Sequence, residues 1–367
     1  MRRVASALVC TNHLFMWAGS ELVAIEMAEE LLARGIRVDI FATLADRDFL
    51  HGVFGDRAGL IERAEAVDLA RYDLVYAQHH VFPPILDAAL ARGPIGAGPV
   101  LVCNHLSPFV PLEAPGPFVE PALADVILAN SAETLAMLAE LGPPLDAARL
   151  WPNPAPRAFA GLPAPPAAQT YLAVSNHRTP ELAAALDLLA RQGTPVRRIG
   201  QGHASERVSP AHMAAAGGVA TIGKTVQYAL RAGRAVYCYG PHGGPGWLDE
   251  GNFEAARAAN FSGRSHPERK SSEKIADELV AGLPAAARFA DAFDPAAHDF
   301  CLEALVDGLL EEAGSRLSDP AWQARRRDLL ASPQTRQAVA LEANLCGAIR
   351  KFYLNFRKSR GDAARVA

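Results

Sequence analysis

Short apolar runs alternate along this chain with longer segments whose apolar residues recur every three or four positions. Residues 21–34 show the helical spacing, with Ser20 as the expected N-cap and Gly35 at the end. The short runs predict buried strands, and in the first half they lie at residues 4–10, 38–42, 74–77, 100–103 and 126–129. Strands that alternate with helices predict a parallel sheet with right-handed crossovers.

A proline-rich segment then interrupts the pattern, with eight prolines in residues 143–166. Apolar runs resume beyond it at residues 170–175, 196–199, 219–222 and 235–239, and a helix is expected over residues 272–283. From about Pro295 onward the spacing is helical throughout. The expected organisation is an α/β chain with an N-terminal Rossmann-like domain (1–155), a second Rossmann-like domain (156–290) and a helical extension (291–367).

Polar residues recur directly after the strands of the first half, namely His13, Gln78, His79, His105 and Asn130. The carboxyl ends of parallel strands form the edge at which open α/β sheets bind ligands. His79, His80 and His105 are therefore expected to face a cleft, and His79 and His105 are candidates for catalysis. The competing reading of each is a structural histidine, which is the more frequent role.

Composition narrows the class of partner. The net charge of −4 over 367 residues gives no reason to expect nucleic acid. Five widely spaced cysteines without a C-x-x-C pair indicate neither a metal nor a redox site, and favour a reducing cytoplasm. No stretch is long enough to span a membrane. Residues 350–358 mix bases with aromatics, which suits either peripheral contact with the inner face of an anionic membrane or a solvated helix end.

The stretch from Gly218 to Trp247 carries the most specific chemistry. It predicts a strand, a helix over residues 225–232, a second strand and a glycine-rich turn over residues 240–246. The helix follows Gly223, so free N–H groups and the positive end of the helix dipole face the ligand edge. Lys224 adds a positive charge that we expect to lie in solvent, and Thr225 can cap the helix or contact an anion. A phosphate is the expected ligand.

The same letters match the P-loop pattern G-x-x-x-x-G-K-[ST] over residues 218–225. In a P-loop the strand precedes the first glycine and the spacer forms the phosphate cradle. Here the spacer is itself the expected strand, which argues against a P-loop. A Mg²⁺-dependent P-loop nucleotidase is nevertheless kept as one of three functional hypotheses.

Several ordered motifs resemble glycosyltransferase family 4, a family with the two-domain GT-B fold. They are Trp17-Ala-Gly-Ser-Glu21 at a helix start, Val126-Ile-Leu-Ala-Asn-Ser131 before another helix, and Trp151-Pro-Asn-Pro154 at the linker. The stretch from Gly223 to Tyr239 is similar to the segment that faces the donor diphosphate in such enzymes. This chain departs from the family in two respects. Neither Glu250 nor Glu254 follows another glutamate by eight positions, and the second domain, at about residues 169–289, is short for a donor domain.

The resemblance implies metal-independent transfer of a sugar from a nucleotide-sugar donor to an acceptor such as a surface glycan or glycolipid, as in polysaccharide biosynthesis, with no cofactor. Asp46-Arg47-Asp48 matches the D-x-D of metal-dependent transferases but is expected to be a solvated loop. The implied catalytic candidates are His105, His79 and Glu254, and the implied donor-binding candidates are Gly19, Arg178, Gly223, Lys224, Thr225, Gly243, Gly244 and Arg264. Arg264 could instead pair with Glu268. We expect the loops at residues 15–20 and 241–246 to face each other across the cleft.

Because the expected glutamate pair is missing, a non-catalytic module that binds a nucleotide sugar or a partner protein is the competing reading.

Overall fold

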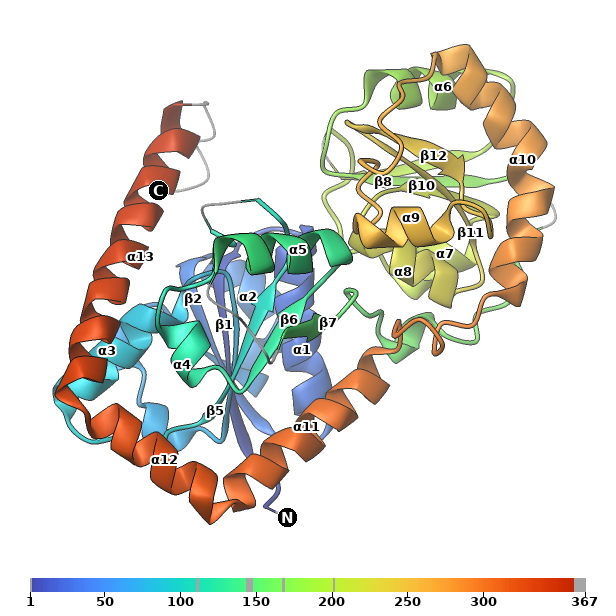
Figure 1. Ribbon diagram of the computed structural model, residues 1–367. Coiled ribbons are helices and arrows are strands. Elements are labelled where there is room, and N and C mark those ends of the chain that lie inside the picture. Colours follow the sequence, from blue (N-terminus) through green and yellow to red (C-terminus); the bar gives the residue numbers. More distant parts are fainter. Residues whose placement is uncertain (1, 110–111, 143–147, 167–168, 201, 360–367) are drawn as a thin grey trace.

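The computed structural model describes residues 2–109, 112–142, 148–166, 169–200 and 202–359, and it contains two separate sheets (Figure 1). The first sheet has seven parallel strands in the order β3-β2-β1-β4-β5-β6-β7. These strands are β1 (Ser6–Leu14), β2 (Arg37–Ala45), β3 (Ala58–Ile61), β4 (Leu74–Gln78), β5 (Val100–His105), β6 (Val126–Ala129) and β7 (Ala148–Leu150). We call this sheet and the helices packed on it the N-terminal lobe.

Helices cover both faces of this sheet. Successive side chains of each strand point to opposite faces, so apolar strands present an apolar surface on each face for helices to cover. In β5, Val100 and Val102 join one apolar cluster with α1, while Leu101 and Cys103 join another with α3. The helices that follow these strands are α1 (Gly19–Ala33), α2 (Arg47–Phe54), α3 (Phe82–Arg92), α4 (Val119–Leu123) and α5 (Ala132–Leu141). Ser131 caps α5 as expected, since its hydroxyl accepts the N–H of Thr134.

The second sheet has five strands in the order β12-β11-β10-β8-β9, of which β12 runs antiparallel to β11. The strands are β8 (Tyr171–Ser175), β9 (Val196–Gly200), β10 (Gly218–Thr221), β11 (Ala235–Gly240) and β12 (Gly243–Trp247). They pack with α6 (Pro180–Arg191), α7 (Pro210–Ala214), α8 (Lys224–Arg231), α9 (Phe253–Ala258) and α10 (Ser272–Ala292). This unit is the C-terminal lobe.

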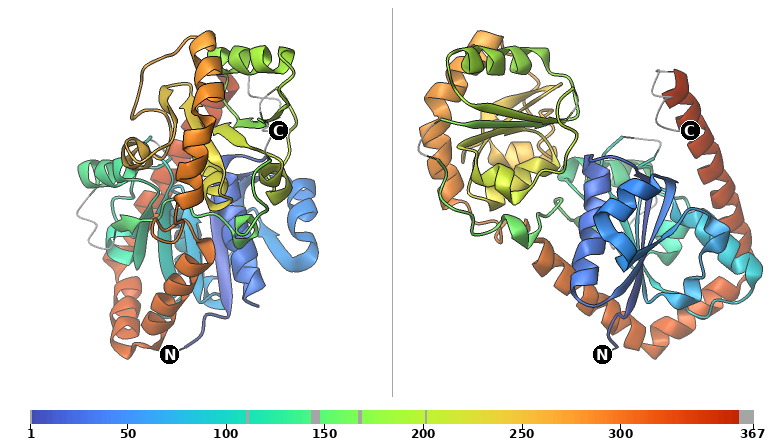
Figure 2. Two further views of the ribbon diagram at one scale, coloured as in Figure 1. Left: turned by 90° about the vertical axis from the view of Figure 1, so that its right-hand side faces the viewer. Right: turned by 180° about the vertical axis from the view of Figure 1, so that it is seen from behind.

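The last three helices leave the C-terminal lobe and return to the N-terminal one (Figures 1 and 2). They are α11 (Leu302–Ser318), α12 (Pro320–Ala331) and α13 (Pro333–Ser359). The Trp322 indole N–H donates to buried Asp125 of the N-terminal lobe at 2.8 Å, and α13 packs beside α3. None of the helices in the described ranges is apolar over a length that could cross a bilayer. All five cysteines are free thiols.

The structure corrects several sequence-based boundaries. The loop expected after residue 10 is still strand as far as Leu14, and Ser20 is not the N-cap of α1, because the helix already begins at Gly19 after Ala18. The glycine-rich turn expected at residues 240–246 contains strand β12. The helical C-terminal part begins at Leu302 rather than near Pro295.

The proline-rich segment is only partly irregular. Within it, β7 pairs with β6 and so belongs to the first sheet, while residues 143–147 lie outside the described part of the chain. The first sheet therefore ends at Leu150, and the second begins at Tyr171. No strand of the described ranges joins the two sheets.

Candidate functional site

A cavity of about 360 Å³ lies between the lobes, at the carboxyl ends of strands from both sheets. The N-terminal lobe contributes residues 17–20, His79 and Glu113, and the C-terminal lobe contributes residues 175–177 and 222–225. Both sheets therefore present their ligand edges to one space. Asn176 fixes the two walls to each other, because its side-chain amide donates to the Trp17 carbonyl at 2.9 Å.

The N-terminus of α1 opens onto this cavity. Ala18 caps the helix without any side-chain hydrogen bond, and Gly19 and Ser20 of the first turn line the cavity. A Cβ at Gly19 would meet no atom within 4 Å, so the glycine keeps open space at the helix end. Gln78 holds this end in place by donating to the Ser20 carbonyl at 2.7 Å. A helix end of this kind is suited to bind an anion.

A second helix end comes from the C-terminal lobe. Gly223 is the N-cap of α8 with φ +61°, a conformation that favours glycine, and Lys224 begins the helix. Thr225 is not the cap, because it already lies inside the first turn, although it lines the cavity as expected. The P-loop reading is wrong, since Gly218 begins strand β10 instead of following a strand.

Lys224 was expected to reach into solvent, and the structure shows that it does not. Its ammonium is buried, with 5% of the side chain exposed, and Nζ lies 2.7 Å from Glu26 Oε2 on α1. It also donates to the Pro154 carbonyl at 3.0 Å. Burial lowers the pKa of Lys224, and the Glu26 carboxylate opposes that shift. The lysine therefore joins the two lobes.

Glu26 is the centre of this interlobe network, although nothing in the sequence singled it out. The Tyr228 hydroxyl donates to its carboxylate, and Arg207 approaches it at 3.7 Å while binding Glu29 through two hydrogen bonds of 2.7 Å. The one sequence feature that could have pointed to Glu26 is its position relative to the apolar residues of the helix. Glu26 stands four positions after Leu22, on the apolar stripe of its helix.

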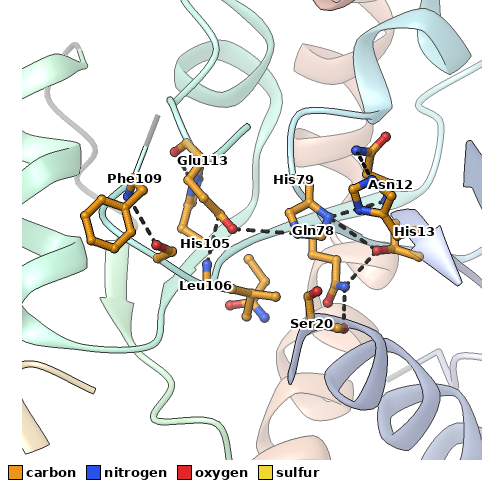
Figure 3. Close-up of polar contacts among 12 residues, drawn as sticks. Asn12, His13, Ser20, Gln78, His79, His105, Leu106, Phe109 and Glu113 are labelled. Atoms are coloured by element: carbon orange, nitrogen blue, oxygen red, sulfur yellow. Dashed lines mark hydrogen bonds and ion pairs between the residues drawn. The ribbon is translucent and has the colours of Figure 1, made fainter. Parts of the chain in front are cut away.

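His79 lines the cavity from the turn after β4, where it adopts φ +59° (Figure 3). The backbone N–H of Asn12 donates to its Nδ1 at 3.3 Å, which places the ring proton on Nε2. Burial, followed by neighbouring His13 and His105, lowers the pKa of His79 to about 3. The ring is therefore neutral, and its Nε2 lies 3.7 Å from Glu113 Oε1.

Glu113 is a buried carboxyl on the same wall, and the sequence pattern gave no signal for it. Its Oε2 accepts the Leu106 N–H at 3.0 Å (Figure 3). Burial raises the pKa of Glu113 to about 7, even though His105 and the Leu106 N–H act in the opposite direction. This carboxyl can hold or release a proton near neutral pH.

His105 and His80 lie away from the cavity lining. His105 donates from Nδ1 to the Glu113 carbonyl, and its Nε2 lies 3.0 Å from Glu120. Burial alone would lower the pKa of His105, but Glu120 and Glu113 outweigh it and raise the pKa. His80 contacts Glu342 of α13 at 2.8 Å. Of the three histidines expected at the cleft, His79 is the one that lines it.

Five other predicted site residues also lie elsewhere. Arg178 is exposed beside a separate cavity under α6, and Glu254 is an exposed residue of α9 near Arg257 and His298. Arg264 pairs with Glu133 of α5, not with Glu268, through a 3.0 Å bond from Nε.

Gly243 and Gly244 belong to β12, where a Cβ on either residue would overlap backbone atoms. The prediction that the loops at residues 15–20 and 241–246 face each other across the cleft is therefore wrong. Residues 175–177 line the cavity instead of the second loop.

The D-x-D residues have a structural role at the start of α2, where Asp46 accepts the Phe49 N–H. In the described ranges, no group of three or more His, Cys, Asp or Glu side chains is arranged to hold a metal ion.

Comparison with known proteins identifies the fold. No protein-family model matches the sequence, and a search of curated proteins finds no match. Among solved structures, a glycosyltransferase from Rickettsia africae is 12% identical over 86% of this chain and 99% of its own, with a TM-score of 0.51. Anabaena HepE in complex with UDP is 14% identical over 83% and 100%, with a TM-score of 0.48. The kitacinnamycin glycotransferase is 14% identical over 85% and 100%, also with a TM-score of 0.48. The two sheets, the cavity between them and the likeness to the Rickettsia enzyme show that this chain has the GT-B glycosyltransferase fold, extended by C-terminal helices.

Proposed function

We propose that this protein is a glycosyltransferase that moves a sugar from a nucleotide-sugar donor to a hydroxyl-bearing acceptor such as a surface glycan or glycolipid, without a metal ion or other cofactor. The observation that carries the proposal is the convergence of two helix N-termini, those of α1 and α8, on the interlobe cavity. Transfer from such a donor requires stabilisation of the departing diphosphate, and helix N-termini supply it with fixed N–H dipoles.

Gly19 and Gly223 have separate roles in this proposal. Gly19 leaves room for the phosphates against the first turn of α1, and Gly223 turns the chain into α8 so that its first N–H groups face the cavity. Lys224 lies beside the same helix end, but its charge is paired with Glu26 at 2.7 Å, so the helix N–H groups supply most of the positive potential. Kinship with family 4 is part of the proposal and rests on the motifs at residues 17–21, 126–131 and 151–154.

The test begins with donor binding. Thermal shifts of the full chain are measured with nucleoside diphosphates, their sugar conjugates and the free nucleosides, since a ligand of the folded state raises the melting temperature. Diphosphates are expected to stabilise the protein and nucleosides much less. Consumption of the best donor is then followed by mass spectrometry with candidate glycan acceptors.

A matched pair of variants locates the site. Gly19→Val adds a side chain at the helix end and is expected to abolish diphosphate binding while the protein stays folded, because the added Cβ meets open space. Gly52→Val adds the same side chain at another open helical glycine, outside the cavity, and is expected to leave binding unchanged. Equal binding by both variants would contradict the assignment.

A non-catalytic module remains the second candidate, because Glu254 lies outside the cavity. Donor binding without consumption of any donor would favour it.

We place the protein in a reducing cytoplasm, in peripheral contact with the inner membrane face. The support is a stripe on α13 where Leu341, Leu345 and Phe352 are exposed and Lys351 adds a charge. Side chains from residue 356 onward lie outside the described part. Flotation with anionic and neutral vesicles tests the contact, and no flotation with either kind would contradict it.

A further inference from the structure

A second cavity, of about 320 Å³, lies in the N-terminal lobe against α13, and we call it the α13 cavity. Asn12 of β1 and Thr43 of β2 line it on one side, and residues between 343 and 350 of α13 line it on the other. None of the described residues that line it belongs to the C-terminal lobe. Its volume falls in the range of small-molecule sites, about 300–1,000 Å³, so a sugar unit can enter it.

The α13 cavity and the interlobe cavity share a wall. His79 lines the interlobe cavity and its neighbour His80 lines the α13 cavity, and the same holds for Glu113 and Leu112. The two segments are joined, because the His80 N–H donates to the Leu112 carbonyl at 3.2 Å. Asn12 lines the α13 cavity while its N–H donates to His79 on the other side (Figure 3). A ligand in the α13 cavity therefore lies next to the expected donor site.

Arg350 brings a positive charge to the α13 cavity. Its Nη2 donates to the Thr43 carbonyl at 2.7 Å, and its Nε is buried with no hydrogen-bond partner among the described residues. Burial lowers the pKa of Arg350, and no carboxylate of the described residues opposes that shift. A half-buried guanidinium without a carboxylate partner favours an anionic ligand, since guanidinium N–H groups bind carboxylate and phosphate oxygens in pairs.

The acidic side chains of the same cavity do not cancel this charge. Glu62 forms an ion pair with Arg47, and Glu65 lies 3.6 Å from Arg63. Each of the two carboxylates therefore has its own arginine, and the charge of Arg350 is left for a ligand.

His80 leaves a polar atom without a partner beside the same cavity. Its Nε2 lies 2.8 Å from Glu342 Oε1, which places the ring proton on Nε2 and makes Nδ1 an acceptor. Only 4% of the side chain is exposed, and Nδ1 has no hydrogen-bond partner among the described residues. Unsatisfied buried polar atoms are uncommon in folded proteins, so this one is a second indication of a polar occupant.

We infer that the α13 cavity binds an acidic sugar unit of the acceptor, whose carboxylate or phosphate group pairs with Arg350. This inference rests on the proposed function and names the class of its acceptor. A neutral sugar would leave the Arg350 guanidinium unpaired, whereas an acidic one provides the missing anion. Because the cavity belongs to the N-terminal lobe and adjoins the interlobe cavity, its ligand is the acceptor and not the donor.

The experiment measures binding to the full chain by calorimetry, with nucleoside diphosphate present so that the donor phosphate site is filled. The probes are methyl glucuronide, methyl glucoside 6-phosphate and the neutral methyl glucoside. The parent should bind the two acidic glycosides more tightly than the neutral one. Arg350→Gln should weaken binding of the acidic glycosides about tenfold or more and leave the neutral one unchanged. Arg336→Gln, at an exposed position of the same helix, is the matched control and should change neither.

A second pair of variants tests the cavity without altering its charge. Gly347 lines the α13 cavity, and a Cβ there would meet no atom within 4 Å, so Gly347→Leu should fill the space and abolish binding of the acidic glycosides while the protein stays folded. Gly308→Leu adds the same side chain at an open glycine of α11, outside the cavity, and should leave binding unchanged.

The outcomes separate this inference from the proposed function. Equal affinity of the parent and Arg350→Gln for the acidic glycosides, or no binding of them, would overturn the inference. Inorganic phosphate bound as tightly as the glycosides would indicate a site for free anions, and binding of anionic vesicles alone would indicate a lipid contact, and either result overturns the acceptor assignment. Transfer to neutral acceptors that Arg350→Gln does not slow would overturn it while leaving the proposed function intact. A parent protein that binds the acidic glycosides but never consumes a donor would overturn the proposed function, and with it the acceptor role, while leaving the anion site in place.

Discussion

The interlobe ion pair between Lys224 and Glu26 gives the sharpest test of how the two lobes are held together. Only 5% and 2% of these side chains are exposed, so replacing one partner leaves the other charge buried. Removing one member of such a pair costs about 3–5 kcal/mol. Glu26 keeps the Tyr228 hydroxyl, and Arg207 remains 3.7 Å away. We therefore expect Lys224→Met to cost about 3 kcal/mol, near the lower end of that range.

The measurement is urea unfolding followed by tryptophan fluorescence, with Lys224→Met, Glu26→Gln and the double variant compared with the parent. Because each single variant strands a charge that the double variant removes, the double variant should lose at least about 1 kcal/mol less than the sum of the two singles. Arg264→Gln is the control at the more exposed interlobe pair with Glu133, and should cost about 1 kcal/mol or less.

The reasoning is refuted if Lys224→Met unfolds within about 0.5 kcal/mol of the parent, the range typical of surface substitutions. It is also refuted if the two substitutions are additive, because additivity would mean that the two side chains do not interact.

Three further outcomes follow from the described contacts. Gly244→Ala should lower the urea midpoint strongly without affecting diphosphate affinity of the folded protein, because its Cβ would overlap the Cys238 carbonyl and Gly244 does not line the cavity; an unchanged midpoint would contradict this. Glu342→Gln, which weakens the buried contact with His80, should increase amide hydrogen exchange of α13 by about tenfold or more, measured by mass spectrometry, since hydrogen bonds to a charged group contribute about 1.5–3 kcal/mol. Glu113→Gln should gain stability relative to the parent as pH rises from about 4.5 to 7. Folding raises the pKa of Glu113, so its protonated form stabilises the parent below the unfolded pKa, and this stabilisation is lost as pH rises through the folded pKa. A pH-independent difference in urea unfolding would contradict this prediction.

Most of the fold could be predicted from the sequence because parallel strands buried on both faces are continuously apolar. The run at residues 126–129 matches β6 at both ends. Strands β3, β7 and β12 escaped prediction for a physical reason. β3 has four residues and β7 has three, none of them buried, and β12 reads Gly-Gly-Pro-Gly-Trp, so each depends mainly on backbone pairing to a neighbouring strand.

The site was predictable to a smaller extent. Helix starts follow from the local sequence, so Gly19 and Gly223 could be named as donor-binding candidates, and the structure places both in the lining of one cavity. Glu113 could not be found in this way, because it lies in a segment without periodicity and becomes a site residue only when the chain folds back against His79. Its raised pKa is produced by burial, which no local pattern encodes.

Two of the three cations singled out in the sequence, Lys224 and Arg264, are paired in a way that bears on donor binding. Each is paired with a carboxylate from the opposite lobe, Glu26 for the first and Glu133 for the second. The local sequence pattern predicts a free positive charge at this position, whereas in the structure that charge joins the two lobes. The positive potential that remains for a diphosphate then comes chiefly from the backbone N–H groups of α1 and α8. Because such dipoles are fixed by the helices and need no side chain to be released from a partner, they would stabilise the leaving group of the proposed transfer without reorganisation.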